Sequence, residues 1–72
     1  MNYQNFISIK SGNRFGRPCV RNSRISVFDV LSNLASGMTE EGILSDYPEL
    51  TAEDIKACLA YAADRERKIR IA

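Results

Sequence analysis

Residues 15–31 read FGRPCVRNSRISVFDVL, and they predict an extended segment that turns and then enters a helix. Pro18 fixes its own φ angle and pushes the residue before it toward extended geometry, so Cys19–Val20 is predicted to form a brief strand. Asn22 tolerates the left-handed region and is expected to make the turn, with the Ser23 hydroxyl bonding the local backbone.

Three signals place the start of the first helix directly after this turn. Ser26 is a favourable N-cap, and Asp29 stands at the third helical position, where its carboxylate can accept a hydrogen bond from the backbone N–H of the N-cap residue. Ile25 can pack against Val30 as a hydrophobic staple. A helix is therefore predicted over residues 27–36.

Two more helices are expected after tight, capped turns. Gly37 closes the first helix in left-handed geometry, and Thr39 is the predicted N-cap of a short helix over residues 40–46 that Pro48 terminates. Thr51 caps the third helix, and good helix formers continue its pattern as far as residue 68.

Apolar residues at helical spacing predict which faces are buried. The predicted core positions are Val27, Val30, Leu31, Leu34 and Met38 in the first helix and Ile55, Cys58, Leu59, Ala62 and Ala63 in the third. The tail Lys68–Ile71 alternates charged and apolar residues, which is typical of a strand, although no partner for it is evident within the chain. The alternative is a frayed, solvated end of the third helix.

The N-terminal residues predict a second short strand. Residues 6–10 alternate apolar and polar, as in a half-buried strand, and pairing of residues 7–10 with residues 19–21 would make a loose hairpin. Because an isolated two-stranded hairpin is marginal in water, either the helical body or the hairpin of a second subunit must cover it.

The predicted fold class is mainly α, a three-helix, helix-turn-helix-like bundle with a short N-terminal β-hairpin arm. We expect residues 1–25 to form a basic β arm that serves dimerisation, residues 26–66 the three-helix body, and residues 67–72 a basic C-terminal tail. A plain helical bundle shows the same periodicity, so the pattern alone does not establish DNA binding.

Charge is segregated along the 72 residues, although the net charge is only +1. Residues 1–28 carry five cations and no acid, residues 29–64 carry a net −7, and residues 65–72 carry a net +3. Such segregation predicts separate partners for the separate segments.

The composition argues against several classes of protein. Two cysteines far apart and no histidine indicate neither a disulfide framework nor a zinc site, and no cofactor is expected. Cys58 is expected to be buried, and Cys19 is also given a structural role, although its arginine neighbours could lower its pKa. Without an apolar run of about 20 residues, the chain is expected to be cytoplasmic.

Several motifs of this chain occur in order in a known family. They are Gly16-Arg17-Pro18, Val20-Arg21, Ser23-Arg24-Ile25, Asp29-Val30-Leu31, Ala35 to Glu41, Ile43-Leu44, Asp46-Tyr47-Pro48, Leu50-Thr51, Glu53-Asp54-Ile55 and Ala57 to Ala63. Over about residues 7–64 the chain resembles the bacterial family catalogued as domain of unknown function four-three-three, whose members are often described as VapB-type antitoxins.

The resemblance implies a homeodomain-like helical fold with an N-terminal β element. It also implies that the chain is the antitoxin of a type II toxin–antitoxin pair, which binds and neutralises a PIN-like ribonuclease toxin. A second implied role is binding of its own operator DNA. The alternative is a protein-binding or dimerisation module of the same fold with no role on DNA.

An enzyme is not expected. The chain has no histidine, no nucleophile elbow and no glycine-rich phosphate loop. The acidic pairs Glu40-Glu41 and Glu53-Asp54 stand in predicted first helical turns, where carboxylates complement the helix dipole. Their position therefore has a structural explanation.

Three sets of residues are candidates for binding partners. Because Glu53 and Asp54 at the start of the third helix would be repelled by phosphates, DNA contacts are assigned to the basic arm. The DNA-binding candidates are Arg14, Arg17, Arg21 and Arg24. The toxin-binding candidates are Arg65, Arg67, Lys68, Ile69, Arg70 and Ile71, and the homodimerisation candidates are Phe6, Ile7 and Ile9.

Overall fold

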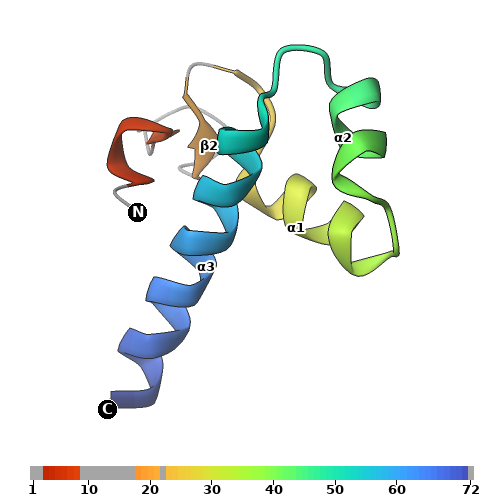
Figure 1. The fold of residues 1–72 in the computed structure, drawn as a ribbon. Helices are drawn as coiled ribbons and strands as arrows, with labels where there is room; N and C mark the ends of the chain where they lie inside the picture. The colour runs from red at the N-terminus through yellow and green to blue at the C-terminus, as the bar shows by residue number, and fades with distance from the viewer. Residues whose placement is uncertain (1–2, 9–17, 22, 72) are drawn as a thin grey trace.

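A computed structural model describes residues 3–8, 18–21 and 23–71 of the chain, the last four of them as backbone only. Its elements, in chain order, are a 3-10 helix η1 (Tyr3–Asn5), strands β1 (Ile7–Ser8) and β2 (Cys19–Val20), and helices α1 (Val27–Ala35), α2 (Glu40–Asp46) and α3 (Ala52–Ile71). Figure 1 shows α1 and α2 on one side of α3, with the strands and η1 near its N-terminal half. The prediction of a mainly helical fold with three helices and a short two-stranded sheet is confirmed.

The two strands pair as the sequence predicts. They are antiparallel, with Ile7 opposite Val20 and Ser8 opposite Cys19, and the Arg21 N–H donates to the Phe6 carbonyl over 2.7 Å. The remaining residues of the predicted hairpin, 9–10, lie outside the described part of the chain.

The helical body of the same chain covers this hairpin. Both β1 and η1 lie against α3, and Cys19 and Val20 have no exposed surface. Val20 is a member of the hydrophobic core, and Ile7 packs against that core from β1. The cover that a two-stranded hairpin requires is therefore present within one chain.

The cap of α1 forms as predicted. The Asp29 N–H donates to Ser26 Oγ over 3.0 Å, and the Ser26 N–H donates to Asp29 Oδ2 over 3.2 Å, which completes the capping box. The helix ends at Ala35, one residue earlier than predicted, and Gly37 follows with a φ angle of 103°. Glycine accepts this left-handed geometry without the steric cost that a Cβ atom brings.

Helix α2 has the predicted bounds. The Gly42 N–H donates to Thr39 Oγ1 over 3.0 Å at its start, and the helix ends at Asp46 before Pro48. Ile43 is fully buried and attaches this short helix to the core.

The core lies where α1, α2 and α3 meet the second strand. Its buried members are Val20, Ile25, Val27, Val30, Ile43, Leu50, Ile55 and Cys58. The predicted burial of Leu59 and Ala63 is wrong, since Leu59 is 48% exposed and Ala63 is also exposed. The buried residues of α3 are Asp54, Ile55, Ala57 and Cys58, and at about 100° per residue the middle of their arc lies about 120° from Leu59. Leu59 therefore points away from the core.

The tail is helical and not extended, which agrees with the alternative of a solvated helix end. Helix α3 continues through Lys68–Ile71 and crosses the expected boundary between residues 66 and 67. No breaker interrupts this segment, so the helix propagates through good helix formers, and Asp64 and Arg67 add an ion pair at i, i+3 spacing. The C-terminal half of α3 projects beyond the other elements (Figure 1).

Candidate functional site

The turn between β2 and α1 is built around Arg21 and Ser23. Arg21 adopts the left-handed region with a φ angle of 46°; Asn22, to which the sequence assigned that geometry, lies outside the described residues. Ser23 Oγ donates to the Val20 carbonyl over 2.7 Å and accepts from the Ile25 N–H over 3.1 Å, which confirms its predicted role.

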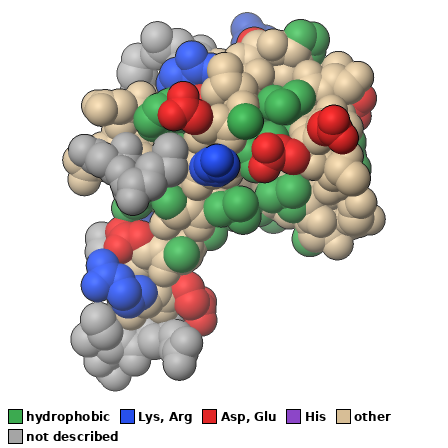
Figure 2. Space-filling model, in the orientation of Figure 1, with side chains coloured by type: hydrophobic (Ala, Val, Ile, Leu, Met, Phe, Trp, Pro, Cys, Tyr) green, Lys and Arg blue, Asp and Glu red, His purple; other side chains and the backbone are tan. Residues whose placement is uncertain are grey.

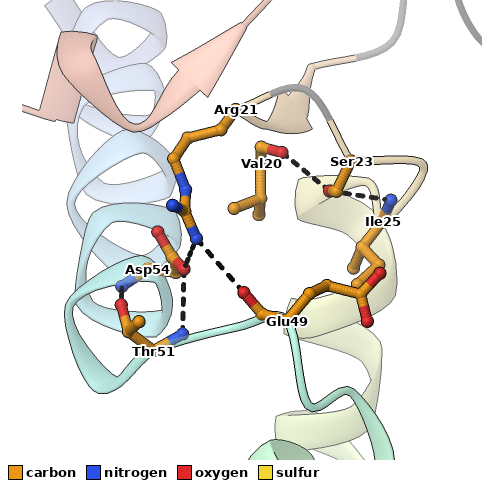
Figure 3. A network of polar contacts seen from close by, with 7 residues as sticks. All are labelled: Val20, Arg21, Ser23, Ile25, Glu49, Thr51 and Asp54. Carbon is orange, nitrogen blue, oxygen red and sulfur yellow. Dashed lines mark hydrogen bonds and ion pairs between the residues drawn. The ribbon is translucent and has the colours of Figure 1, made fainter.

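The Arg21 side chain reaches from this turn to the start of α3. Its Nη2 donates to Asp54 Oδ2 over 2.5 Å and to the Glu49 carbonyl over 3.2 Å (Figure 3). An open hollow of about 360 Å³ lies beside these groups, lined by Val20, Arg21, Ser23 and Glu49. The ion pair joins the basic turn to the acidic body, two segments 33 residues apart.

Asp54 has two functions in this arrangement. It completes the capping box of α3, because its N–H donates to Thr51 Oγ1 over 3.2 Å and its Oδ2 accepts from the Thr51 N–H over 2.9 Å. The same Oδ2 accepts from Arg21, while the buried Oδ1 has no hydrogen-bond partner among the described residues. A carboxylate with no exposed surface needs this cation, since an unpaired buried charge is costly.

This burial corrects the premise that both Glu53 and Asp54 present their charge at the start of α3 and would repel phosphates there. Glu53 is exposed, whereas Asp54 is fully buried. The negative surface at this end of α3 therefore comes from Glu53 and from the exposed Glu49 in the preceding loop. No sequence signal paired Asp54 with Arg21, because a capping role accounts for an acid at the third helical position.

The predicted DNA-binding residues are not equivalent in the structure. Arg21 is held by Asp54, although 47% of its side chain remains exposed. Arg24 is exposed in the same turn. Arg14 and Arg17 lie outside the described residues. Among the described candidates, Arg24 presents the more accessible charge.

The predicted toxin-binding residues lie on the projecting half of α3. Arg65 and Arg67 are exposed, and Arg67 Nη2 donates to Asp64 Oδ1 over 2.8 Å. The guanidinium carbon of Arg65 lies 5.8 Å from the centroid of the Tyr61 ring. Lys68, Ile69, Arg70 and Ile71 belong to the same helix, described there by its backbone.

An aromatic contact attaches η1 to the base of this projecting segment. The rings of Tyr3 and Tyr61 meet edge to face with centroids 5.5 Å apart, and the Tyr3 hydroxyl donates to Asp64 Oδ2 over 2.5 Å. This hydrogen bond to the Asp64 carboxylate, with some desolvation, raises the pKa of Tyr3 above its ordinary value.

The predicted dimerisation residues are engaged within the chain. Phe6 and Ile7 are half-buried, and Ile7 packs on the core; Ile9 lies outside the described residues. Dimerisation through this arm stays a prediction. It was motivated by the need of a two-stranded hairpin for cover, and α3 of the same chain supplies that cover.

Cys58 is a buried thiol with a perturbed titration. Burial, together with the negative charge of Asp54, raises its pKa to about 12. The folded-state pKa lies above the unfolded value of about 8.5. The contribution of the buried neutral thiol to the free energy of unfolding is therefore fully present below pH 8.5, and it is lost as the pH rises toward 12.

Between pH 8 and pH 10, we therefore expect the free energy of unfolding of the wild-type chain to fall by about 2 kcal/mol more than that of Cys58→Ala. Urea denaturation followed by circular dichroism at both pH values measures this difference. Parallel losses in the two proteins would mean that the thiolate is hydrated in the fold.

The described ranges 3–8, 18–21 and 23–71 were also compared with the requirements of a metal site and of a membrane-spanning helix. No group of three or more histidine, cysteine, aspartate or glutamate side chains there is arranged to hold a metal ion. No helix in this part of the chain has the length and apolar character that a bilayer crossing requires.

Two known proteins resemble this chain. An uncharacterized protein of Sinorhizobium fredii is 40% identical over 47 residues, which are 65% of this chain and 21% of that protein. The crystal structure of a DUF433 member protein from Anabaena variabilis matches with a TM-score of 0.83 and 34% identity, covering 93% of this chain and 66% of that chain. The chain thus spans only part of the length of each relative.

The family comparison extends over most of the chain. Residues 7–62 match the family described as Protein of unknown function (DUF433). This range includes both strands, α1, α2 and the packed half of α3. Because the match covers well over half of the sequence, the chain belongs to the DUF433 family.

Proposed function

We propose that this DUF433 domain is a protein-binding module, and that its partner is the toxin of a bacterial type II toxin–antitoxin pair. The VapB-type resemblance suggests a PIN-like ribonuclease as that toxin. The observation that carries the proposal is the projecting end of α3, which presents exposed cations away from the core. A basic helix of this kind suits an acidic groove, and such nucleases cluster acidic residues around their metal ions.

The surface of the helix-turn-helix-like part also favours a protein partner. In DNA-binding proteins of this topology, the N-terminal residues of the last helix read base edges. Here that end of α3 carries the exposed Glu53 next to Glu49, and phosphates would repel both. Arg21, which lies nearby, is already paired with Asp54.

Operator binding is the second role that we propose, and it would use the basic turn before α1. The exposed Arg24 and the absence of acids in residues 1–28 favour it. Contact with phosphates there would make the affinity depend steeply on salt, by about 0.9 log units per log unit of salt for each phosphate neutralised.

The two roles make opposite predictions for two exposed arginines. Arg65→Glu should weaken binding to the proposed PIN-like nuclease toxin by about tenfold, because it reverses a charge on the proposed contact. Arg24→Glu should leave that affinity unchanged and should weaken binding to the upstream DNA. Isothermal titration calorimetry measures the first affinity, and gel shifts at two salt concentrations measure the second.

A chain ending at Asp64 supplies the stronger test of the toxin contact. If it binds the nuclease as tightly as the full chain does, the projecting helix is not the contact. If neither the wild-type chain nor its variants bind the upstream DNA, the result supports the alternative of a purely protein-binding module.

A further inference from the structure

The outer face of α3 carries a pattern that the core does not explain. Lys56, Leu59, Ala63 and Glu66 are exposed, and their spacing of three, four and three residues places them on one side of the helix. Leu59 is 48% exposed, and among the described residues only it and Phe28 are large hydrophobic side chains exposed to solvent.

The surroundings leave this face accessible. Helices α1 and α2 and the N-terminal elements pack against the other side of α3, around Ile55 and Cys58. Figure 2 shows apolar side chains along the middle of the molecule and charges of both signs on the segment that projects below it. Most of a helix's stability in proteins comes from tertiary packing, and the C-terminal half of α3 projects beyond the other elements (Figure 1).

We propose that this face pairs with the same face of a second copy of the chain, with the two α3 helices antiparallel. A two-fold axis passing midway between Leu59 and Ala63 sets Leu59 of each chain against Ala63 of the copy. The small alanine gives the leucine room, as a hole receives a knob between packed helices. The same axis sets Lys56 against Glu66 of the copy, because both lie five residues from the centre.

Charge favours the antiparallel arrangement over the parallel one. It brings the projecting end, with its net +3 over residues 65–72, beside the copy's acidic N-terminal end of α3, where Glu53 and Glu49 are exposed. A parallel pair would set Lys56 against Lys56 and Glu66 against Glu66. The charges of this face are thus complementary to those of a second copy in the antiparallel orientation.

Arg65, which belongs to the proposed toxin contact, lies outside the central contacts of this pairing. Arg65 is two residues from Ala63, a rotation of about 200°, so it lies near the opposite side of α3. There its guanidinium group approaches the Tyr61 ring. A dimer could therefore still present Arg65 to another protein.

The test is sedimentation velocity of the full chain between about 1 and 100 µM, a range suited to a small interface. We expect a dimer for the wild type and a monomer for Leu59→Glu. The matched control is Phe28→Glu, which makes the same kind of change at the other large exposed hydrophobic side chain among the described residues, on α1 outside the proposed contact, and should leave the dimer intact. Circular dichroism should show that both variants keep the wild-type helix content.

A charge exchange then tests the orientation. Lys56→Glu and Glu66→Lys should each raise the dissociation constant about tenfold, because each creates two like-charge contacts per dimer. The double variant should return it to within about threefold of the wild-type value. Within one chain the two residues are ten positions apart, about 15 Å along the helix, so direct contact inside a chain cannot explain this rescue.

Each other result counts against the proposal. A monomeric wild type over the whole range overturns it, and a Leu59→Glu variant that still dimerises moves the interface elsewhere, with the N-terminal arm as the alternative. Loss of dimer in both charge variants without rescue in the double variant excludes the antiparallel register.

Discussion

Replacing Asp54 with alanine is expected to lower the free energy of unfolding by about 3 kcal/mol. The variant loses the acceptor for the Thr51 N–H in the cap and the anion that holds the Arg21 guanidinium group. Removal of one partner of a buried pair costs about 3 to 5 kcal/mol, and the half-exposed Arg21 justifies the lower end. Urea denaturation followed at 222 nm measures the change.

Glu53→Ala is the matched control, because Glu53 occupies the same helical turn and is exposed. We expect it to change the free energy of unfolding by less than about 0.5 kcal/mol. A core of this size supplies only about 3 to 5 kcal/mol, so Asp54→Ala could leave little folded protein. Asp54→Asn keeps an acceptor for the cap and should lose about half as much. Equal stability of the Asp54 and Glu53 variants would show that the ion pair contributes nothing.

This ion pair also affects how DNA-binding experiments are designed. Arg21→Ala would remove a proposed DNA contact and would at the same time leave the buried Asp54 carboxylate without the guanidinium group that pairs with it. A loss of DNA binding in that variant would therefore have two explanations. Arg24, exposed in the same turn, separates the two effects.

Ile43→Ala should lower the free energy of unfolding by about 3 kcal/mol and release α2 from the body. Ile43 is fully buried and is the buried residue of this seven-residue helix. A helix this short does not form alone in water, so its stability depends mainly on the packing of this fully buried side chain in the core. Chemical denaturation, together with amide hydrogen exchange over residues 40–46, measures both effects.

Leu44→Ala is the comparison for this prediction. Leu44 is the next residue of α2 and only packs against the edge of the core, so about 1 kcal/mol is expected for its truncation. If exchange in α2 is as slow in Ile43→Ala as in the wild type, the helix is held by its cap and loops instead.

Local chemistry made the element boundaries predictable. The serine and threonine caps, the acids at the third helical position and Gly37 act through hydrogen bonds and backbone geometry within four or five residues. The predicted bounds of α2 match the structure, and those of α1 differ by one residue. The strand pairing was also predictable, since alternation in residues 6–10 and Pro18 before the second strand left few choices.

Features set by distant contacts were not predictable. The Arg21–Asp54 pair joins residues 33 positions apart, and a capping role already explained the acid. The predicted strand at Lys68–Ile71 was wrong because alternation without a neighbouring sheet edge does not make a strand, and the preceding helix simply continues.

By itself, the sequence determined where the three helices begin, how the hairpin pairs and that charge is segregated, because caps, turns and periodicity act over a few residues. Only the tertiary structure decided that Asp54 is buried while Glu53 is exposed, and that Leu59 faces solvent. Adjacent residues on a helix differ by about 100°, and which side becomes the inside depends on where β2 and α1 pack. That packing rotates α3 so that its one outward leucine lies between a lysine and an alanine.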